Sequence, residues 1–342
     1  MRHAFGLMLA SVVAALAIAG VWYWTSAPRA DAAPPQTMAA RPSPQATAPA
    51  KLAAKDDIET TASVASRFAA LPAPPVAPQK AGCTNPDALG VSRVVEIDTT
   101  GGPGFGFEHF KQLDFLEPKE VVLTFDDGPW PGNTPAVLKA LDDECTKAVF
   151  FPIGKHATWH PEILKQVYAA GHTVGSHTWS HADLSKKTPD EAKDEIEKGF
   201  SAAHAALGGP LAPFFRFPDL RQPPEMISYL EGRNIAMFST DVDSFDFKIH
   251  KPDQIITSVM TKLKKQGKGI ILMHDFQHGT AQALPQLLAE LKAGGFKVVQ
   301  LRPKSAVETL AEYDAMMSQE IKGGTANAKP TASVVRTVSD GN

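Results

Sequence analysis

Short apolar runs alternate with amphipathic helical patterns from about residue 120 to residue 301, and this order limits the folds open to the chain. Apolar runs bounded by turn residues are typical of buried strands, whereas apolar residues three and four positions apart are typical of helices. Strands that alternate with helices pair in parallel. We therefore expect an α/β fold, a distorted (β/α)7 barrel of parallel strands, with a doubly wound open sheet as the alternative. The predicted strands are residues 121–125, 148–153, 173–176, 214–217, 235–240, 270–274 and 297–301, with a further candidate at 93–97.

Residues that favour helix ends divide the segments between these strands. Thr134 is predicted to cap a helix that has Pro135 in its first turn. Thr188 and Glu191 have the spacing of a capping box, and Gly208 is predicted to end the long helix that follows. The other predicted helices are residues 161–170, 252–266 and 280–293.

The two ends of the chain differ in composition from the part between them. Residues 1–26 have an early positive charge and then an apolar stretch, which is typical of a signal peptide or a membrane anchor. Residues 27–82 are rich in Ala and Pro, and we expect a disordered stalk there. Residues 319–342 are expected to form a disordered tail. One folded domain, residues 83–318, remains between these segments.

The predicted leader indicates that the domain lies outside the cytoplasm. It would then be periplasmic, attached to the inner membrane through an uncleaved N-terminal segment, or secreted. Cys83 and Cys145 are the only two cysteines, and in an oxidising compartment we expect them to form a disulfide, with two free buried thiols as the alternative. The net charge is −3 and no long basic run is present, which argues against a nucleic-acid partner, because such binding depends on cations that neutralise phosphates.

Ionisable residues follow five of the predicted strands, at the point where each strand ends. The carboxyl ends of parallel strands open on the same face of a barrel, where active sites lie. We therefore expect all five segments to meet at one mouth. The residues are Asp126 and Asp127, then His177 and His181, then Arg216 and Asp219, then Asp241, Asp243 and Asp246, and finally His274 and Asp275.

Some of these residues have the chemistry of a metal site. Asp127 directly follows another carboxylate, and adjacent like charges repel each other unless a cation or a proton intervenes. His177 and His181 lie four residues apart, so on a helical turn both imidazoles would face one ion. Three protein ligands would leave positions open for water and substrate, as in catalytic sites. His156 and His160 have the same spacing, and spacing alone leaves both pairs open.

The remaining residues suit acid–base chemistry. If Asp127 binds a cation, Asp126 is free to act as a base. His274 ends an apolar run, where an imidazole can act as a general acid if a carboxylate such as Asp246 keeps it protonated. Arg216 could pair with a carboxylate and hold its pKa down, or form an ordinary structural ion pair.

Five motifs, in order along the chain, resemble those of the polysaccharide deacetylases of the NodB-homology type, carbohydrate esterase family 4. The resemblance covers residues 121–301, a little over half the chain, and it favours the later histidine pair. The motifs are Thr124-Phe125-Asp126-Asp127-Gly128, His177-Thr178-Trp179-Ser180-His181, Arg216-Phe217-Pro218, Asp243-Ser244-Phe245-Asp246-Phe247 and Ile270-Ile271-Leu272-Met273-His274.

This resemblance implies a metal-dependent hydrolase that removes acetyl groups from an acetylated glycan, such as a chitooligosaccharide or peptidoglycan. It implies one divalent metal ion, with zinc expected and cobalt or nickel as alternatives. The metal ligands that it implies are Asp127, His177 and His181. The catalytic residues that it implies are the base Asp126, steadied by Arg216, and the acid His274, supported by Asp246.

The chain departs from the family pattern at three positions. Asp219 and Leu220 stand where the family has an aromatic residue and a glycine, and Phe247 stands in place of tryptophan. An Asp219 carboxylate turned inward would oppose negative charge that develops during the reaction. Two alternatives therefore stay open: a non-catalytic, membrane-tethered carbohydrate-binding relative, and a metal amidohydrolase for a non-sugar amide. Trp130 and Trp179 are candidates for stacking on a sugar ring, or for the core.

Overall fold

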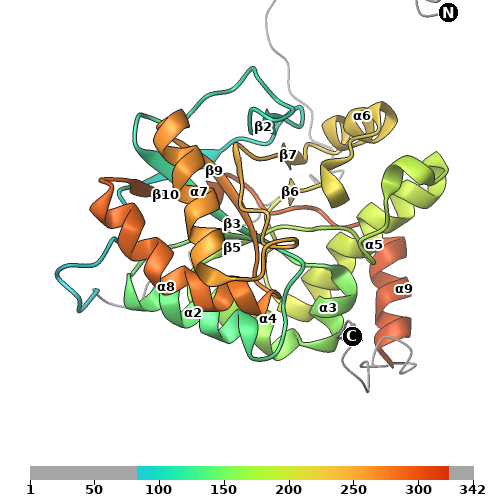
Figure 1. Ribbon diagram of the computed structural model, residues 1–342. Helices are drawn as coiled ribbons and strands as arrows, with labels where there is room; N and C mark the ends of the chain where they lie inside the picture. Colours follow the sequence, from blue (N-terminus) through green and yellow to red (C-terminus); the bar gives the residue numbers. More distant parts are fainter. Residues whose placement is uncertain (1–82, 323–342) are drawn as a thin grey trace, which may run out of the picture. The chain divides into compact units, whose positions relative to one another are not determined.

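The computed structural model describes residues 83–322 of the 342-residue chain (Figure 1). The predicted leader at 1–26 and the predicted stalk at 27–82 lie outside the described residues, as does most of the predicted tail. Residues 319–322 belong to helix α9 (Ala311–Lys322), so the prediction of a disordered tail is wrong for them. In the described part of the chain, no helix has both the length and the apolar composition needed to cross a membrane.

The fold is α/β, and every strand pairing in the described residues is parallel. The larger sheet has the order β1-β10-β3-β4-β5, and β9 lies between β3 and β8. Its strands are β1 (Arg93–Ile97), β3 (Glu120–Asp126), β4 (Val149–Phe151), β5 (Thr173–Val174), β8 (Val242–Asp243), β9 (Gly269–His274) and β10 (Lys297–Pro303). The smaller sheet, in the order β2-β7-β6, consists of β2 (Gly104–Phe105), β7 (Ala236–Phe238) and β6 (Phe214–Phe215).

The two sheets together form a ring, which confirms the expectation of a distorted barrel. Ser176, just after β5, makes a parallel bridge to Phe215 in β6. At the other side, only three residues separate β7 from β8, which pairs with β9, and β9 pairs with β3. The pairings therefore run from β3 through β4, β5 and β6 to β7, and from β8 through β9 back to β3, while β7 and β8 are joined by the chain and not by a strand pairing.

The predicted strand at 235–240 is shorter in the structure, where β7 ends at Phe238. The reason is a side chain. The backbone carbonyls of Phe238 and Ser239 accept hydrogen bonds from the Arg216 guanidinium, at 3.2 and 2.9 Å, and not from a neighbouring strand. A buried carbonyl that is satisfied by a side chain no longer needs a strand partner.

The helices lie outside the ring (Figure 1). Helix α7 packs on α8, α8 on α2, and α5 on α3, α4 and α9. The helices are α2 (Asn133–Asp143), α3 (Gly154–Trp159), α4 (Pro161–Ala169), α5 (Pro189–Leu207), α6 (Pro224–Gly232), α7 (Pro252–Gln266) and α8 (His278–Ala293), with short 3-10 turns at Leu184–Lys186 and Pro218–Leu220.

The capping predictions had mixed outcomes. The capping box of Thr188 and Glu191 is present at the start of α5, and Gly208 ends this helix in the left-handed conformation. The prediction that Thr134 caps α2 is wrong, because the N-cap is Gly132 and Thr134 lies inside the helix. The Thr134 hydroxyl accepts a hydrogen bond from the backbone N–H of Trp130 and donates one to Asp275.

Strand β3 divides the core into two parts, because its side chains alternate between two faces. All of its residues are buried. Val121, Leu123 and Phe125 belong to the larger apolar cluster, which also includes residues of the surrounding helices. Val122 belongs to a second cluster with residues of β4, β6 and β7 inside the ring. Asp126 shares the inner face of β3 with Val122 and therefore lies at the carboxyl end of the ring.

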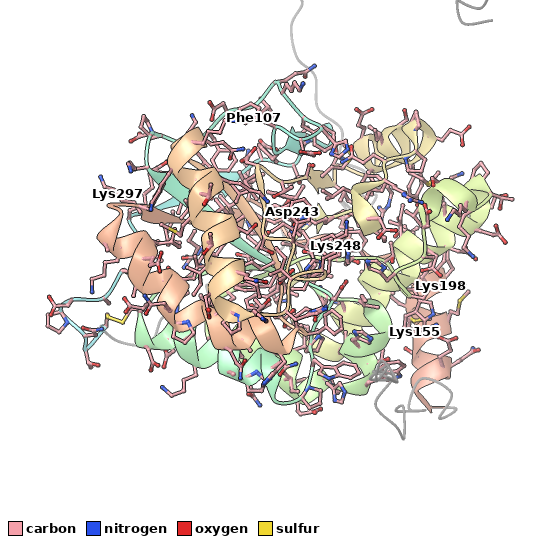
Figure 2. All side chains as sticks on the ribbon, viewed as in Figure 1. Phe107, Lys155, Lys198, Asp243, Lys248 and Lys297 are labelled. Carbon is pink, nitrogen blue, oxygen red and sulfur yellow. A yellow bond between two sulfur atoms is a disulfide. The ribbon has the colours of Figure 1, made fainter. Side chains whose placement is uncertain are left out.

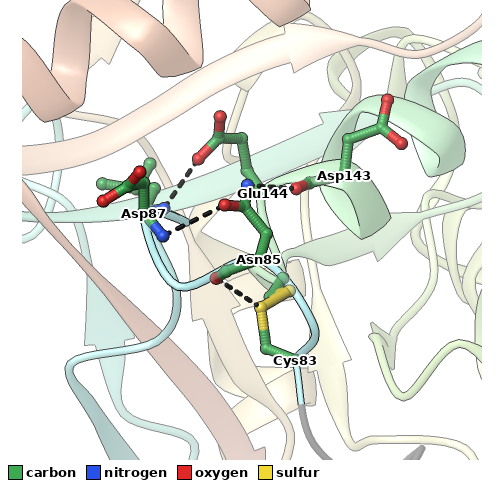
Figure 3. Close-up of a disulfide and its surroundings, with 7 residues drawn as sticks. Cys83, Asn85, Asp87, Asp143 and Glu144 are labelled. Carbon is green, nitrogen blue, oxygen red and sulfur yellow. Dashed lines mark hydrogen bonds between the residues drawn. A yellow bond between two sulfur atoms is a disulfide. The ribbon is translucent and has the colours of Figure 1, made fainter.

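The predicted disulfide between Cys83 and Cys145 is present, with Cα atoms 5.7 Å apart (Figure 3). It joins the segment before β1 to the end of α2. Two hydrogen bonds run beside it, from the Asn85 side chain to the Asp143 carbonyl at 3.2 Å and from the Leu89 N–H to the Glu144 carboxylate at 2.6 Å. The start of the described domain is therefore attached to α2 covalently and by polar contacts.

One histidine, at the amino ends of β4 and β5, makes the stability of the fold depend on pH. His172 is buried, and its Nδ1 accepts a hydrogen bond from the backbone N–H of Ala148 at 3.1 Å. Burial lowers the pKa of His172 to about 3, with a smaller contribution from Lys147. The folded state therefore binds fewer protons than the unfolded chain between pH 3 and the ordinary histidine pKa, and the stabilisation is lost as the pH falls through this window.

We predict that His172→Asn, whose side-chain oxygen can accept the same hydrogen bond, reduces this loss of stability. Urea unfolding of wild type and variant at pH 4, 5, 6 and 7 measures the free energy of unfolding of each. The difference in free energy of unfolding between wild type and variant should change by up to about 1.4 kcal/mol per pH unit below pH 6. Parallel pH profiles for the two proteins would contradict the assignment.

Candidate active site and metal centre

A pocket of about 380 Å³ opens at the carboxyl ends of the strands. All five of the predicted polar segments contribute side chains to it, so the expectation that they meet at one mouth is confirmed. The residues that line the pocket are Asp126, Asp127, His177, His181, Phe217, Asp219, Leu220, Arg221, Asp243, Phe247, Leu272 and His274.

Three of the predicted acids, Asp241, Asp246 and Asp275, do not line this pocket, and of these Asp241 has its contacts elsewhere. Asp241 accepts hydrogen bonds from the backbone N–H groups of Phe107 and Ile270, at 2.6 and 2.7 Å, and lines a separate pocket with Phe107. Asp243, two residues later, lines the site (Figure 2 labels Phe107 and Asp243). The prediction for Asp241 is wrong because this residue precedes β8, and so lies before the carboxyl end of that strand.

Asp127, His177 and His181 form a group that could hold a metal ion. Asp127 Oδ1 lies 3.5 Å from Nε2 of each imidazole. One potential ligand atom from each residue lies within 4.8 Å of the others. The same Asp127 oxygen is buried and has no hydrogen-bond partner in the described part of the chain. Buried polar atoms are normally paired, so an oxygen left unpaired between two imidazoles fits a cation.

His177 is held in the form that a metal ligand needs. Its Nδ1 lies 2.7 Å from the Arg216 carbonyl oxygen, which can only accept, so Nδ1 carries the proton and Nε2 presents a lone pair to Asp127. Burial, helped by the nearby His181, lowers the pKa of His177 well below its usual value. A neutral imidazole is the form that binds a metal ion.

The spacing of His177 and His181 predicted a helical turn, and this prediction is wrong. Residues 177–181 form an irregular loop in which Thr178 and His181 have positive φ angles of 66° and 57°. The backbone N–H of His181 is bonded to the Thr178 hydroxyl at 3.0 Å. The imidazole rings meet nearly edge to face, with centroids 4.9 Å apart. The loop thus brings both rings to one point without a helix.

Asp126 and Arg216 form a buried ion pair beside this group. Arg216 Nη1 donates to Asp126 Oδ1 at 2.7 Å and to the Thr124 hydroxyl at 2.8 Å. The side chains of Asp126 and Arg216 are 2% and 0% exposed, so water contributes little to their solvation. Burial raises the pKa of Asp126, although Arg216 and His274 act to lower it. The expected pairing is present, but burial outweighs the lowering of the pKa that we expected from Arg216.

His274 and Asp246 form a second ion pair near Asp127. His274 Nδ1 lies 2.6 Å from Asp246 Oδ1, and the His274 backbone N–H donates to Asp246 Oδ2 at 2.7 Å. His274 Nε2 lies 4.0 Å from Asp127 Oδ2. Burial alone would lower the pKa of His274, but the interactions with Asp246 and then with Asp127 and Asp126 raise it to about 10.

Sequence reasoning missed several residues around the site. The Thr280 hydroxyl in α8 also donates to Asp246, and this contact has no signal in the motifs. Trp130 and Trp179, the candidates for stacking, do not line the pocket, and Phe217 and Phe247 do. The Phe247 ring lies against His274, with centroids 5.8 Å apart, and is 42% exposed.

The second histidine pair has other contacts. His156 Nδ1 lies 2.6 Å from the backbone carbonyl oxygen of Asp127, and both His156 and His160 pack against the Trp130 ring. Neither lines the pocket. The structure thus places the later pair, and not this one, around Asp127.

Two of the departures from the family pattern, which directly follow the Arg216-Phe217-Pro218 motif, lie at the rim of the pocket. Asp219 and Leu220 have positive φ angles of 53° and 55°. Together with Arg221 they line both the site and an adjoining groove of about 810 Å³. Arg221 is paired with Asp183. The rim segment 219–221 therefore lies between the site and the adjoining groove.

Comparison with known proteins gives one consistent result. Residues 116–237 match the family model described as polysaccharide deacetylase. A chitooligosaccharide deacetylase of Bradyrhizobium is 30% identical over 199 residues, which are 54% of this chain and 90% of that protein. A peptidoglycan-N-acetylglucosamine deacetylase of Listeria monocytogenes is 31% identical over 188 residues, again 54% of this chain but only 38% of its own length.

A solved structure shares the fold as well. The peptidoglycan deacetylase of Bdellovibrio bacteriovorus aligns with a TM-score of 0.58 and 32% sequence identity. The alignment covers 72% of this chain and 68% of that chain.

The buried ion pair of Asp126 and Arg216 leads to a prediction about stability. Arg216→Met removes the cation and leaves a carboxylate in the ring interior, which should lower the free energy of unfolding by about 3–5 kcal/mol. The double variant Arg216→Met with Asp126→Asn removes both charges and should recover part of that loss. Urea unfolding of the metal-free proteins measures both. Equal losses in the single and double variants would show that the charge of Asp126 is not what Arg216 stabilises.

Proposed function

Because the chain belongs to the polysaccharide deacetylase family, we propose that it is a metal-dependent hydrolase that removes N-acetyl groups from a glycan containing N-acetylglucosamine. One observation chiefly supports this proposal. The unpaired Asp127 oxygen lies close to two imidazoles, and the Asp126 carboxylate and the ion pair of His274 and Asp246 lie near this group. Removal of an acetyl group from an amide needs these elements together: an electrophilic centre, a base and an acid.

In this proposal Asp127, His177 and His181 hold one divalent ion. Imidazole nitrogens with one carboxylate oxygen are typical of catalytic zinc, so zinc is our first choice, with cobalt or nickel as alternatives. When bound, the ion would lower the pKa of a coordinated water and polarise the acetamide carbonyl. The neutral state of His177 supports its role as a ligand.

Asp126 is the proposed base. Arg216 fixes one of its oxygens, and the other lies 3.9 Å from His177 Nε2, on the side of the ligand group. Burial raises the pKa of Asp126, which makes its carboxylate a better acceptor for the proton of the attacking water. Arg216 thus orients the base, and its charge acts against the rise in the Asp126 pKa that burial causes.

His274 is the proposed acid. The amine produced when an amide breaks is a poor leaving group unless its nitrogen receives a proton. Asp246 accepts from both the imidazole and the backbone of His274, which fixes the ring and leaves Nε2 directed toward Asp127. The backbone N–H of Asp219 is the proposed donor to the oxyanion, and the effect of its carboxylate there is the least favourable feature of the site.

The substrate that we propose is an acetylated glycan longer than one sugar. Phe247 offers an apolar wall beside His274, and the groove beyond the rim segment 219–221 has room for a neighbouring sugar. The names of the relatives cover two such glycans, a chitooligosaccharide and peptidoglycan. We further propose an extracytoplasmic location, which the disulfide supports, and no nucleic-acid partner.

We predict that Asp127→Ala and His177→Ala each lose both the metal and the activity. The experiment reconstitutes the metal-free protein with zinc, counts bound zinc, and measures acetate released from a chitin tetramer, from peptidoglycan strands and from a non-sugar acetamide. Wild type should release acetate from a glycan, and a chelator should abolish this activity. Lys139→Ala, which alters an exposed ion pair on α2, is the matched control. Full zinc occupancy in both site variants would refute the ligand assignment.

A different pair of variants separates catalysis from binding. Asp126→Asn and His274→Gln should keep zinc but lower kcat by about 10²–10⁴-fold each, because a general base or acid contributes about this much. Steady-state kinetics at saturating zinc measures the effect. If zinc-loaded wild type binds chitin oligomers but is no faster than these variants, the chain is a non-catalytic carbohydrate-binding relative. Acetate release from the non-sugar amide alone would favour the amidohydrolase alternative.

A further inference from the structure

A single peptide unit next to the proposed metal site is held at both of its ends. The backbone carbonyl of Asp127 lies 2.6 Å from His156 Nδ1 and accepts its proton. The N–H of Gly128, in the same peptide unit, donates to Asp275 Oδ1 at 3.0 Å. Because a peptide unit is planar, fixing its carbonyl and its N–H fixes the orientation of the whole plane. That orientation sets the backbone angle on the carboxyl side of Asp127.

Asp127 has a conformation that needs such support. Its φ angle is 72°, in the left-handed region that residues with a side chain rarely occupy. The peptide unit before it is also fixed, since the Asp127 N–H donates to the Phe151 carbonyl at 3.2 Å. The orientation of the Asp127 carboxylate toward His177 and His181 therefore depends on hydrogen bonds of the two peptide units before and after Asp127.

The two residues that hold the peptide are themselves well fixed. Asp275 is 1% exposed, and its second oxygen accepts the Thr134 hydroxyl proton at 2.5 Å. Gly128 fits tightly beneath it, because a Cβ there would lie 2.1 Å from Asp275 Oδ2. His156, in α3, packs between Trp130 and Trp159, with ring centroids 5.2 and 5.1 Å away. These contacts fix both of the side chains that hold the Asp127–Gly128 peptide.

Neither residue has a direct part in the reaction. His156 and Asp275 do not line the pocket, and their contacts with Asp127 and Gly128 go through the backbone. We propose that His156 and Asp275 are positioning residues that set the affinity of the site for a divalent metal ion, by holding the Asp127–Gly128 peptide. This inference rests on the proposed metal binding by Asp127, His177 and His181. Partners that orient metal ligands typically change metal affinity by about 10–100-fold when removed.

The test measures zinc affinity directly, on the full metal-free chain, by competition with a chromogenic chelator. His156→Phe keeps an aromatic ring between the two tryptophans but cannot donate to the Asp127 carbonyl. Asp275→Ala removes the acceptor for Gly128, whereas Asp275→Asn keeps an oxygen in its place. We expect His156→Phe and Asp275→Ala to weaken zinc binding about 10-fold or more, and Asp275→Asn to stay within about 3-fold of wild type.

A second readout separates positioning from catalysis. Once zinc saturates each variant, kcat should return to near the wild-type value, because the base and the acid are intact. His160→Phe is the matched control, since it changes another ring against Trp130 without removing either hydrogen bond of the peptide. Should Asp275→Ala fail to fold, His156→Phe and Asp275→Asn still decide the matter.

The outcomes distinguish this inference from the proposed function. If wild type binds zinc and His156→Phe binds it equally well, the inference is wrong while the metal site stands. Equal weakening in His156→Phe and His160→Phe would assign the effect to ring packing and would also overturn the inference. If wild type binds no zinc, the proposed metal site fails, and this inference fails with it.

Discussion

The buried Arg216 guanidinium links more parts of this fold than any other contact at the site. It lies at the end of β6, and it donates to Thr124 and Asp126 of β3 and to the carbonyls of the last residue of β7 and of the residue after it. Its own backbone carbonyl accepts from His177. Where β7 ends and the ring lacks a regular ladder of hydrogen bonds, the Arg216 side chain thus supplies the donors that the backbone carbonyls need. Since a buried cation is costly unless it is paired, Arg216 and Asp126 each require the other.

The adjacent carboxylates Asp126 and Asp127 differ because of local backbone geometry. In an extended strand two successive side chains point to opposite faces. Asp126 ends β3 and faces the ring interior, where it meets Arg216. At Asp127 the positive φ angle ends the pleat, so that its carboxylate also reaches the pocket. Two residues of the same type thereby enter one site from different directions, with different partners.

Much of the fold and of the site was predictable because it follows from patterns along the chain. The alternation of strands and helices predicted a parallel α/β ring, and the carboxyl ends of the strands predicted which polar residues meet. Predictions failed where long-range contacts decide the outcome. Asp241 looks like a strand-end acid, but it accepts backbone hydrogen bonds from two distant segments. Thr134 looks like a helix cap, but it is bonded to Asp275, which lies 141 residues further along the chain. The spacing of His177 and His181 suggested a helix, but left-handed residues in a loop bring the rings together.

The disulfide has a mechanical consequence for the domain. Tension that enters the chain before Cys83 and leaves it after Cys145 passes through the sulfur bridge and bypasses the segment between them. That segment contains β1, β3 and the residues Asp126 and Asp127. Strand β1 pairs with β10, so a pull on the chain that reached β1 directly would tend to peel it away. With the bridge closed, such a load reaches the end of α2 first and leaves the strand that carries the paired carboxylates unstretched.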